Sequence, residues 1–555
     1  MESHKKTIIY QVLPRLFGNQ NSTRKEWGTA KENGVGKLND FDARILKKIK
    51  DMGVTHIWYT GVIRHATQTD YSKSGIPRQD RNVVKGVAGS PYAIADYYDI
   101  DPDLATDVDK RMEEFEQLVE RTHKVGMKVV VDFVPNHVAR QYRSIAKPEG
   151  VKDLGEDDNV NMHFSTENNF YYCWGQTMQR GSYVESPAKA TGNDQFTANP
   201  GQNDWYETVK LNYGIDYCDA GGRSEHFDPI PNTWNKMTDI LLFWAAKGVD
   251  AFRCDMAEMV PAAFWSWATD KVKFRYPELL FIGEVYDPSQ YRTYIGAGFD
   301  YLYDKVGMYD CIRDVICGQR RAADITAQWQ ATNDIAAHML YFLENHDEQR
   351  IASEFFAGDA KKGIPGLVVS AMLNKNPFML YAGQEFGERG MDKEGFSGTD
   401  GRTTIFDYWS LDTLRKGYYG NEKGEGKSEK LPAAAAALAR TYKKVLNVAL
   451  KSRAVAEGKM FDLMYVNPQL GSRIYAFLRR TEGELLLLVT NFSDEDVAAD
   501  VLIPAHAFEY MNIPEGKAEA EDLLGTSKLK TELKADKPVK VKLKPWSGRV
   551  YKFDI

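Results

Sequence analysis

Cysteine, blocks of basic residues and long apolar runs are all scarce in this sequence. Its 555 residues include five cysteines, with no Cys-x-x-Cys pair and no cysteine and histidine spacing typical of a zinc site. We therefore expect neither a disulfide framework nor a structural zinc, and free thiols fit a reducing compartment. No apolar run approaches the roughly 18 to 20 residues that a membrane span requires.

The chain also has little excess of one charge sign over the other. The formal net charge is -7, which is small for this length, and no lysine and arginine block stands out. Nucleic acid is therefore not expected as a partner. The opening stretch MESHKKTIIYQVLPRLFGN has a short apolar run interrupted by Gln11, Pro14 and Arg15, without a small-residue cleavage site. It predicts a first strand rather than a signal peptide, and hence a cytoplasmic protein without a membrane partner.

Short apolar runs alternate with longer amphipathic stretches as far as about residue 450. The runs predict strands at 7–12, 55–59, 128–133, 249–254, 279–283, 299–303, 339–343 and 378–381. Helical spacing of apolar residues predicts helices that include 41–52, 108–125, 233–247, 262–275 and 431–450. Eight strands in alternation with helices predict an α/β fold, the (β/α)8 TIM barrel.

Composition divides the chain further. Residues 138–227 are rich in Asn, Gly and aromatics and are too long for a structureless loop, so they predict a subdomain inserted after strand three. The barrel would comprise residues 1–137 and 228–451, with a second insertion at about 385–430. From 452 to 555, short alternating runs between turn residues predict a C-terminal antiparallel β-sandwich domain.

Polar residues end four of the predicted strands. The stretches are VVVDFVPNH with Asp132, Asn136 and His137, AFRCD with Arg253 and Asp255, LLFIGE with Glu284, and YFLENHD with Asn345, His346 and Asp347. Each one alone fits a helix N-cap, a turn or a local ion pair. Together they place four carboxylates and two histidines on one rim of a barrel, which is costly unless a reaction uses them.

Paired carboxylates suit glycoside hydrolysis, in which one acid protonates the leaving oxygen and another attacks or stabilises the sugar cation. Arg253 lies one pleat before Asp255, so its charge should keep Asp255 ionised, as a nucleophile requires. Glu284 follows an apolar run and would lie among carboxylates. We therefore expect a raised pKa for Glu284, as a general acid requires.

The chain resembles the alpha-amylase family of glycoside hydrolases over nearly its whole length. The resemblance rests on DFVPNH, FRCD, GE after an apolar strand, and ENHD, which occur in the family's order and spacing. It implies a retaining mechanism with Asp255 as nucleophile, Glu284 as acid and then base, and Asp347 as the residue that binds hydroxyls of the distorted sugar.

The same resemblance implies substrate-binding residues. It assigns hydrogen bonds to the sugar to His137 and His346, stacking to Tyr92 in GSPYAIADYYDIDP, and orientation of the nucleophile to Arg253. KLNY at Lys210–Tyr213 resembles the motif that closes the inserted subdomain, and FMLYAGQEFG resembles the eighth strand of the family.

Two departures limit what carries over. Many starch-degrading members place Lys-His three and four residues after the nucleophile, where this chain has Glu258 and Met259. Glu258 either contacts the leaving sugar or begins a helix. The loop LFGNQNSTRKEWG lacks the aspartates of one calcium site, and Asn136 and Asn212 are the candidate ligands of the other. The chemistry requires no cofactor, and a structural calcium stays an open alternative.

Several functions remain open at this stage. The leading hypothesis is hydrolysis of α-1,4-linked glucans or maltooligosaccharides through a covalent glycosyl-enzyme. Transfer by an α-glucan transglycosylase, or a trehalose- or sucrose-related α-glucosyl activity, would use the same intermediate. A non-catalytic, amylase-like binding protein is a remote alternative, because all three carboxylates are present. The sequence does not indicate linkage preference or oligomeric state.

Overall fold

Eight parallel strands close into a barrel in the computed structural model, which describes residues 6–390, 392–420 and 430–555. The strands are β1 (Ile8–Val12), β2 (His56–Tyr59), β5 (Lys128–Phe133), β14 (Ala251–Cys254), β15 (Leu280–Gly283), β16 (Tyr301–Tyr303), β17 (Met339–Phe342) and β18 (Phe378–Tyr381). The eight predicted strands and the barrel are confirmed. Residues 1–5 lie outside the described residues, as do 391 and 421–429 of the second insertion.

Alternation along the strands fills the barrel. The interior holds one buried side chain or more from most strands, including Ile9, Trp58, Val130, Ala251, Ile282, Leu340 and Met379. Their neighbours in sequence point outward to a second, larger apolar cluster beneath the helices. Because both faces of each strand are buried, the strands read as continuous apolar runs.

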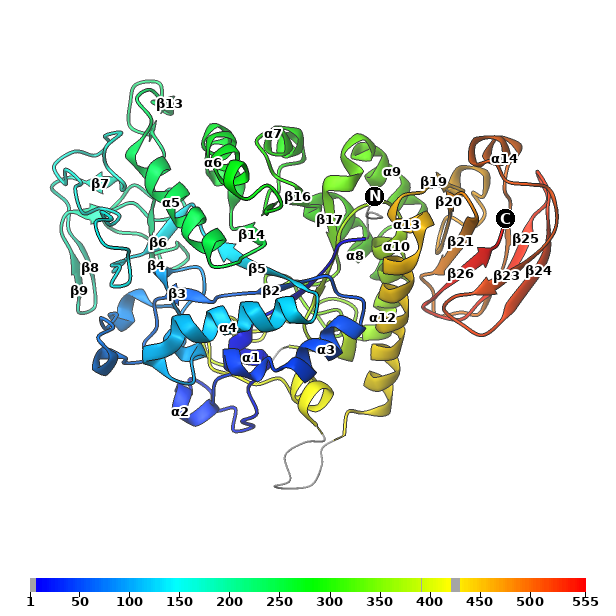
Figure 1. Cartoon of the computed structure of the whole chain (residues 1–555), viewed down its shortest axis with the longest axis horizontal. Helices are drawn as coiled ribbons and strands as arrows, with labels where there is room; N and C mark the ends of the chain where they lie inside the picture. Colours follow the sequence, from blue (N-terminus) through cyan, green and yellow to red (C-terminus); the bar gives the residue numbers. More distant parts are fainter. Residues whose placement is uncertain (1–5, 391, 421–429) are drawn as a thin grey trace.

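Helices cover the outside of the barrel (Figure 1). They include α3 (Ala43–Asp51), α4 (Arg111–Lys124), α5 (Asn232–Ala246), α6 (Ala262–Arg275) and α12 (Ala433–Lys451). In α3 the Asp42 side chain accepts the Ile45 backbone N–H and so caps the helix, while Ile45, Leu46 and Ile49 are buried on one face. This spacing of buried apolar residues along one face is the helical periodicity that predicted the helix from the sequence.

The segment after β5 is built from short antiparallel pairs. β6 (His137–Ala139) pairs with β11 (Thr208–Lys210), and β7 (Tyr172–Cys173) pairs with β10 (Ala188–Lys189). Two hairpins follow the same scheme, β8 (Met178–Arg180) with β9 (Tyr183–Glu185) and β12 (Ile215–Asp216) with β13 (Ser224–Glu225). The insertion therefore has structure of its own. Our boundaries at 137, 227 and 451 stay predictions, and the first of them falls inside β6.

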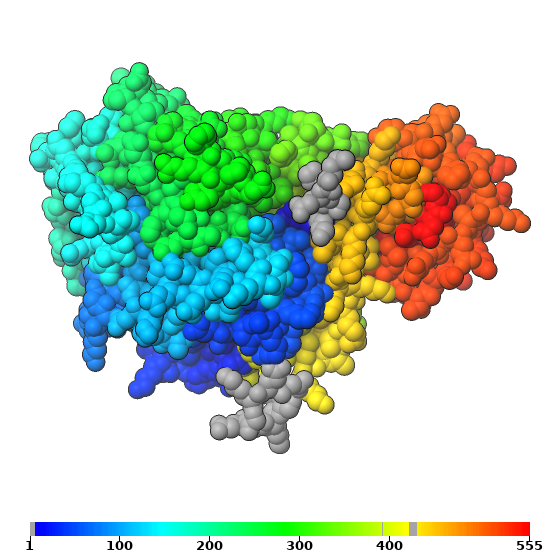
Figure 2. Space-filling model, viewed as in Figure 1, coloured from blue at the N-terminus to red at the C-terminus, as the bar shows by residue number. Residues whose placement is uncertain are grey.

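A separate antiparallel domain follows α12 and the short α13 (Arg453–Ala456). Its six-stranded sheet has the order β19-β20-β21-β26-β23-β24, and β22 pairs with β25 in a second sheet. These strands are β19 (Lys459–Asp462), β20 (Ile474–Thr481), β21 (Glu484–Asn491), β22 (Val497–Val501), β23 (Gly516–Asp522), β24 (Lys528–Leu533), β25 (Val539–Leu543) and β26 (Ser547–Phe553). Figures 1 and 2 show this domain, orange to red, as a lobe beside the barrel, on the side away from the inserted segment.

The helices were compared with the length and apolar character of a membrane-spanning helix. Within residues 6–390, 392–420 and 430–555, none of them combines the length and the apolar character needed to cross a bilayer.

Candidate active site

Arg253 occupies the centre of the barrel mouth. It follows Ala251 on the same face of β14, is fully buried, and lies opposite Asp132 of β5 in the strand register. One guanidinium nitrogen lies 2.6 Å from Asp255 Oδ1, and the other lies 2.8 Å from Glu284 Oε2. A single arginine thus bridges the two carboxylates that follow β14 and β15.

Aromatic rings surround this guanidinium. The ring centres of Trp58, Tyr92 and Tyr303 lie 5.2, 5.4 and 5.5 Å from its central carbon, and Nε donates to the Tyr303 hydroxyl at 3.2 Å. Burial alone would lower the pKa of Arg253, but its neighbours, Glu284 first and Asp255 among them, raise it well above its usual value. The bridge therefore keeps its positive charge.

The two oxygens of Glu284 have different surroundings. Oε2 faces Arg253 and accepts the Met256 backbone N–H at 2.8 Å, whereas Oε1 accepts the Tyr286 hydroxyl at 2.5 Å. Met256 directly follows Asp255 and has a φ of 44°, a left-handed conformation that is strained for a side chain of this size. Strain of this kind is characteristic of functional sites.

Burial dominates the electrostatics of the paired acids. It raises the pKa of Asp255 well above its usual value, and although Arg253 acts against this, the charge of Glu284 adds to it. Burial likewise raises the pKa of Asp132 to about 6, against the effect of Arg253. Arg253 does contact Asp255 as predicted, but its charge does not outweigh the effect of burial on the pKa of Asp255.

The turn after β17 holds the third carboxylate. Asn345 Oδ1 accepts the Asp347 backbone N–H at 2.9 Å, and the Asp347 side chain is 43% exposed. His346 Nε2 lies 3.1 Å from Asp347 Oδ2 and 2.6 Å from the Tyr92 hydroxyl. Burial lowers the pKa of His346 to about 3, and an amide nitrogen of Gln11 lies 2.8 Å from Nδ1, so the proton of the neutral ring lies on Nε2.

A buried lysine takes the place that we had considered for a metal ion. The Lys210 ammonium donates to Asn136 Oδ1 at 2.9 Å and lies 2.6 Å from Asp194 Oδ1, with 3% of its side chain exposed. Lys210 pairs with His137 across β6 and β11, and burial, assisted by Lys210, lowers the pKa of His137 to about 3. Asn136 therefore already binds a cation of the protein itself.

Asn212 is also fully engaged. Its amide nitrogen donates to the backbone oxygens of Ser165 and Asn168 at 2.8 and 3.0 Å, and its Oδ1 accepts the Gly214 backbone N–H at 2.9 Å. Asn136 and Asn212 consequently do not fit a calcium ion, which needs six to eight free oxygen ligands.

Comparison with known proteins identifies the fold and its family. The family model described as the alpha amylase catalytic domain matches residues 11–464. The chain belongs to the alpha-amylase family. It is accordingly a glycoside hydrolase, and the four motifs that suggested the family all lie at the mouth of its barrel.

Relatives of this alpha-amylase family chain are distant. Alpha-amylase 3 of Dictyoglomus thermophilum is 24% identical over 508 residues, covering 88% of this chain and 85% of the relative. Alpha-amylase MalA of Haloarcula japonica is 27% identical over 390 residues, covering 69% of this chain but only 44% of the relative.

Solved structures share the architecture. The alpha-amylase of Geobacillus thermoleovorans in complex with acarbose aligns with a TM-score of 0.66 at 18% identity, covering 100% of this chain and 99% of the other. A maltogenic alpha-amylase from Thermotoga neapolitana aligns with a TM-score of 0.62 at 20% identity, covering 99% of each chain. At these identities the likeness establishes the fold.

Glu258, which departs from many alpha-amylase family members, supports the loop after β15. Its Oε2 accepts the backbone N–H groups of Tyr286 and Asp287, both at 3.0 Å. Since the Tyr286 hydroxyl donates to Glu284, Glu258 positions a neighbour of the candidate acid. Contact with the leaving sugar stays a prediction for Glu258, and contact with the sugar being cleaved stays a prediction for Tyr92, His137 and His346.

Sequence reasoning missed three side chains of this alpha-amylase family site. Tyr303 ends β16 and could have been found as another strand-end polar residue. Tyr286 lies in a loop and Lys210 lies on a short strand of the insertion, and their local sequence gives no signal of contact with Glu284 or Asn136.

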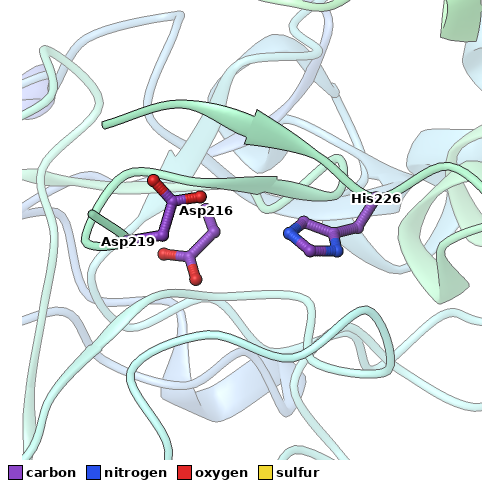
Figure 3. Close-up of side chains that lie close together, drawn as sticks. All are labelled: Asp216, Asp219 and His226. Carbon is purple, nitrogen blue, oxygen red and sulfur yellow. The ribbon is translucent and has the colours of Figure 1, made fainter. Parts of the chain in front are cut away.

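One further group could hold a metal among the residues that the structure describes. Asp216, Asp219 and His226 lie on the β12 and β13 hairpin, with ligand atoms within 4.8 Å of one another (Figure 3). Asp219 accepts the backbone N–H groups of Gly222 and Ser224, and Asp216 accepts that of Cys218. The carboxylates thus shape the hairpin turn, and nothing else in the structure indicates a bound ion.

Proposed function

We propose that this alpha-amylase family protein is a retaining α-glycoside hydrolase that acts on α-1,4-linked glucans or maltooligosaccharides. The observation that carries the proposal is the bridge from Arg253 to both Asp255 and Glu284. It holds two carboxylates close together at the barrel mouth, as a mechanism with a covalent intermediate requires. The names of the relatives, which include an alpha-amylase and a neopullulanase, support an α-glucan substrate.

The surroundings of Glu284 support its role as the acid. Its Oε2 faces two donors, Arg253 and the Met256 N–H, so a proton on the carboxyl belongs on Oε1. The Tyr286 hydroxyl beside Oε1 can donate to the ionised form or accept from the protonated form. We assign the proton that the first step uses to Oε1 of Glu284, because Asp255 Oδ1 faces the Arg253 guanidinium.

The first step breaks the glycosidic bond. Arg253 binds Oδ1 of Asp255, which leaves Oδ2 for attack on the anomeric carbon. As that bond forms, the bond to the leaving oxygen breaks, and this oxygen takes the proton from Glu284 Oε1. The product is a covalent glycosyl ester on Asp255 and a released chain with a free hydroxyl.

The second step restores the enzyme. Glu284, now ionised, takes a proton from water, whose oxygen attacks the anomeric carbon and displaces Asp255. Two inversions at one carbon give net retention. We assign binding of sugar hydroxyls to Asp347 and to the Nε2 proton of His346, because Asp347 is the most exposed of the three acids.

Proton NMR of freshly cleaved maltoheptaose tests this mechanism. We expect the α-anomer to form first and to equilibrate later with the β-anomer. First appearance of the β-anomer would rule out the covalent intermediate. Products longer than the substrate would instead indicate that transfer to a sugar hydroxyl competes with hydrolysis.

A further inference from the structure

A large cleft separates the barrel from the C-terminal domain, at the opposite end of the barrel from the candidate active site. Its volume is about 1040 Å³, and its lining includes Trp329, Asn333, Phe461, Tyr465, His506 and Tyr510. On the barrel side it is lined by α9 (Ile325–Ala331), η10 (Asn333–His338) and the residues just before β18. These segments precede β17 and β18, whereas the candidate acids follow their strands. We call this feature the junction cleft.

Aromatic rings dominate the C-terminal side of the junction cleft. Tyr465 and Tyr510 are 57% and 53% exposed. The centres of their rings lie 6.3 and 6.1 Å from the centre of the Phe461 ring. Exposing large rings side by side is costly unless a ligand covers them. β19 contributes Phe461, η14 (Met464–Val466) contributes Tyr465, and α14 (Ala505–Met511) contributes Tyr510. Figure 1 shows α9 on the barrel side and α14 in the C-terminal domain to its right.

The rings are held in place before any ligand arrives. The Trp329 indole donates to Asp462 Oδ2 at 2.9 Å, and the Tyr465 hydroxyl is hydrogen-bonded to His506 Nε2. Lys459 lies 4.5 Å over the Tyr510 ring and donates to the Tyr510 backbone oxygen at 3.1 Å. Fixed rings lose little conformational entropy on binding, which favours recognition.

The charges around the junction cleft do not favour an ion. The Arg479 guanidinium donates to backbone oxygens, among them those of Leu373 and Val455. Asp334 forms an ion pair with Arg292. Asp462 accepts hydrogen bonds from Trp329 and Tyr475, and Lys375 and Glu509 add one charge of each sign to the lining. Aromatic rings with scattered polar side chains and little net charge match a neutral ligand that has apolar ring faces and many hydroxyls.

We propose that the junction cleft is an accessory binding site for α-glucan chains, distinct from the barrel mouth. Glucose units stack on Tyr465, Tyr510 and Phe461, and their hydroxyls contact polar residues such as Asn333 and Glu509. The identity of the ligand rests on the proposed function, but the site does not take part in bond cleavage. It would keep the enzyme attached to a long glucan while the mouth acts elsewhere on the chain.

Native gel electrophoresis in soluble starch tests the proposal with the full chain, carrying Asp255→Asn so that the starch is not consumed. We expect Tyr465→Ala with Tyr510→Ala to weaken retardation by starch by about fivefold or more, because both stacking faces are lost. The matched control, Tyr465→Phe with Tyr510→Phe, keeps the rings and should stay within about twofold of the parent. Equal retardation of the double alanine variant and its parent would overturn the proposal, as would a parent that starch does not retard.

A short substrate separates this proposal from the catalytic one. With the native Asp255, hydrolysis of p-nitrophenyl α-maltoside should be the same in the double alanine variant and the parent, because a disaccharide does not span the two sites. If the parent cleaves neither the maltoside nor maltoheptaose, the proposed function fails, and the starch gel still decides the junction cleft. If the double alanine variant loses maltoside hydrolysis while its melting temperature is unchanged, the two sites are not separate and the proposal fails.

Discussion

At the mouth of the barrel charged side chains are buried against one another, whereas at the junction cleft aromatic rings stand exposed and charge is sparse. Arg253 is fully buried between Asp255 and Glu284, while Tyr465 and Tyr510 each expose more than half of their surface. In bond cleavage, charge develops and disappears between the steps of the reaction. Burial strengthens the electrostatic interactions that stabilise such charge. Binding a neutral chain needs only flat apolar surface and hydrogen-bonding groups. Matched substitutions at the two sites therefore test this difference.

The largest effect is expected from Asp255→Asn at the mouth. It removes the attacking charge with little change in volume, so turnover of maltoheptaose should fall on the order of a thousandfold or more. Asp334→Asn at the junction cleft makes the same chemical change far from the reaction and should leave initial rates unaltered. Activity above a tenth of the parent in Asp255→Asn would show that another residue is the nucleophile.

Loss of a buried cation should come next. Lys210→Met leaves Asp194 and Asn136 without the ammonium that joins them, and we expect the free energy of unfolding to fall by about 3 kcal/mol in urea titrations. The exposed Lys375→Met at the junction cleft should change it by no more than about 0.5 kcal/mol. A chelator should not alter the unfolding of the parent. A chelator effect on the parent would mean that a calcium ion is bound after all.

Buried histidines should make stability depend on pH. The pKa of His346 is about 3 in the folded chain against 6.5 for the free residue, so the folded state binds fewer protons between these values. Stability is therefore present above pH 6.5 and is lost as pH falls toward 3, at a cost of about 2 kcal/mol by pH 5. Three more histidines act in the same direction, with pKa values of about 4, 3 and 3 for His56, His65 and His137.

Urea unfolding at pH 7 and pH 5 measures this dependence. His346→Gln should reduce the loss of stability between the two pH values, whereas His506→Gln, at an exposed position of the junction cleft, should leave it as in the parent. Equal losses in His346→Gln and the parent would contradict a neutral, buried His346.

The smallest effect is expected from Tyr286→Phe. It deletes the donor to Glu284 Oε1 but keeps the ring, so the ionised form of the acid is less stabilised. We expect kcat/KM for maltoheptaose to fall roughly threefold to tenfold. Tyr465→Phe at the junction cleft is the matched control and should leave kcat/KM unchanged. An unchanged kcat/KM in Tyr286→Phe would remove Tyr286 from the acid step.

Local pattern was enough to predict the barrel. Strands buried on both faces read as short apolar runs, and all eight predicted runs coincide with barrel strands to within two residues. The contact between Arg253 and Asp255 was predictable for the same reason, since side chains two positions apart on a strand lie on one face.

Contacts across the chain were not predictable in this way. Glu258 was weighed as a sugar contact or a helix start, and it does lie in the short 3₁₀ helix Ala257–Met259. Its carboxylate also binds the loop after β15, because the next strand brings Tyr286 and Asp287 beside it. Asn136 was considered for calcium, and only the pairing of β6 with β11 brings Lys210 to it. Both outcomes depend on the register of neighbouring strands.

By itself the sequence determined which chemical groups lie at the barrel mouth, because alternation along a strand and the position of its end are local properties. Which of these charged groups pair with one another, and where the junction cleft lies, depends on the tertiary structure. Arg253 meets Glu284 through the pairing of β14 with β15, and the cleft brings Trp329 and Tyr510 together from segments about 180 residues apart. Such distances depend on the packing of the whole chain, which no short stretch of residues encodes.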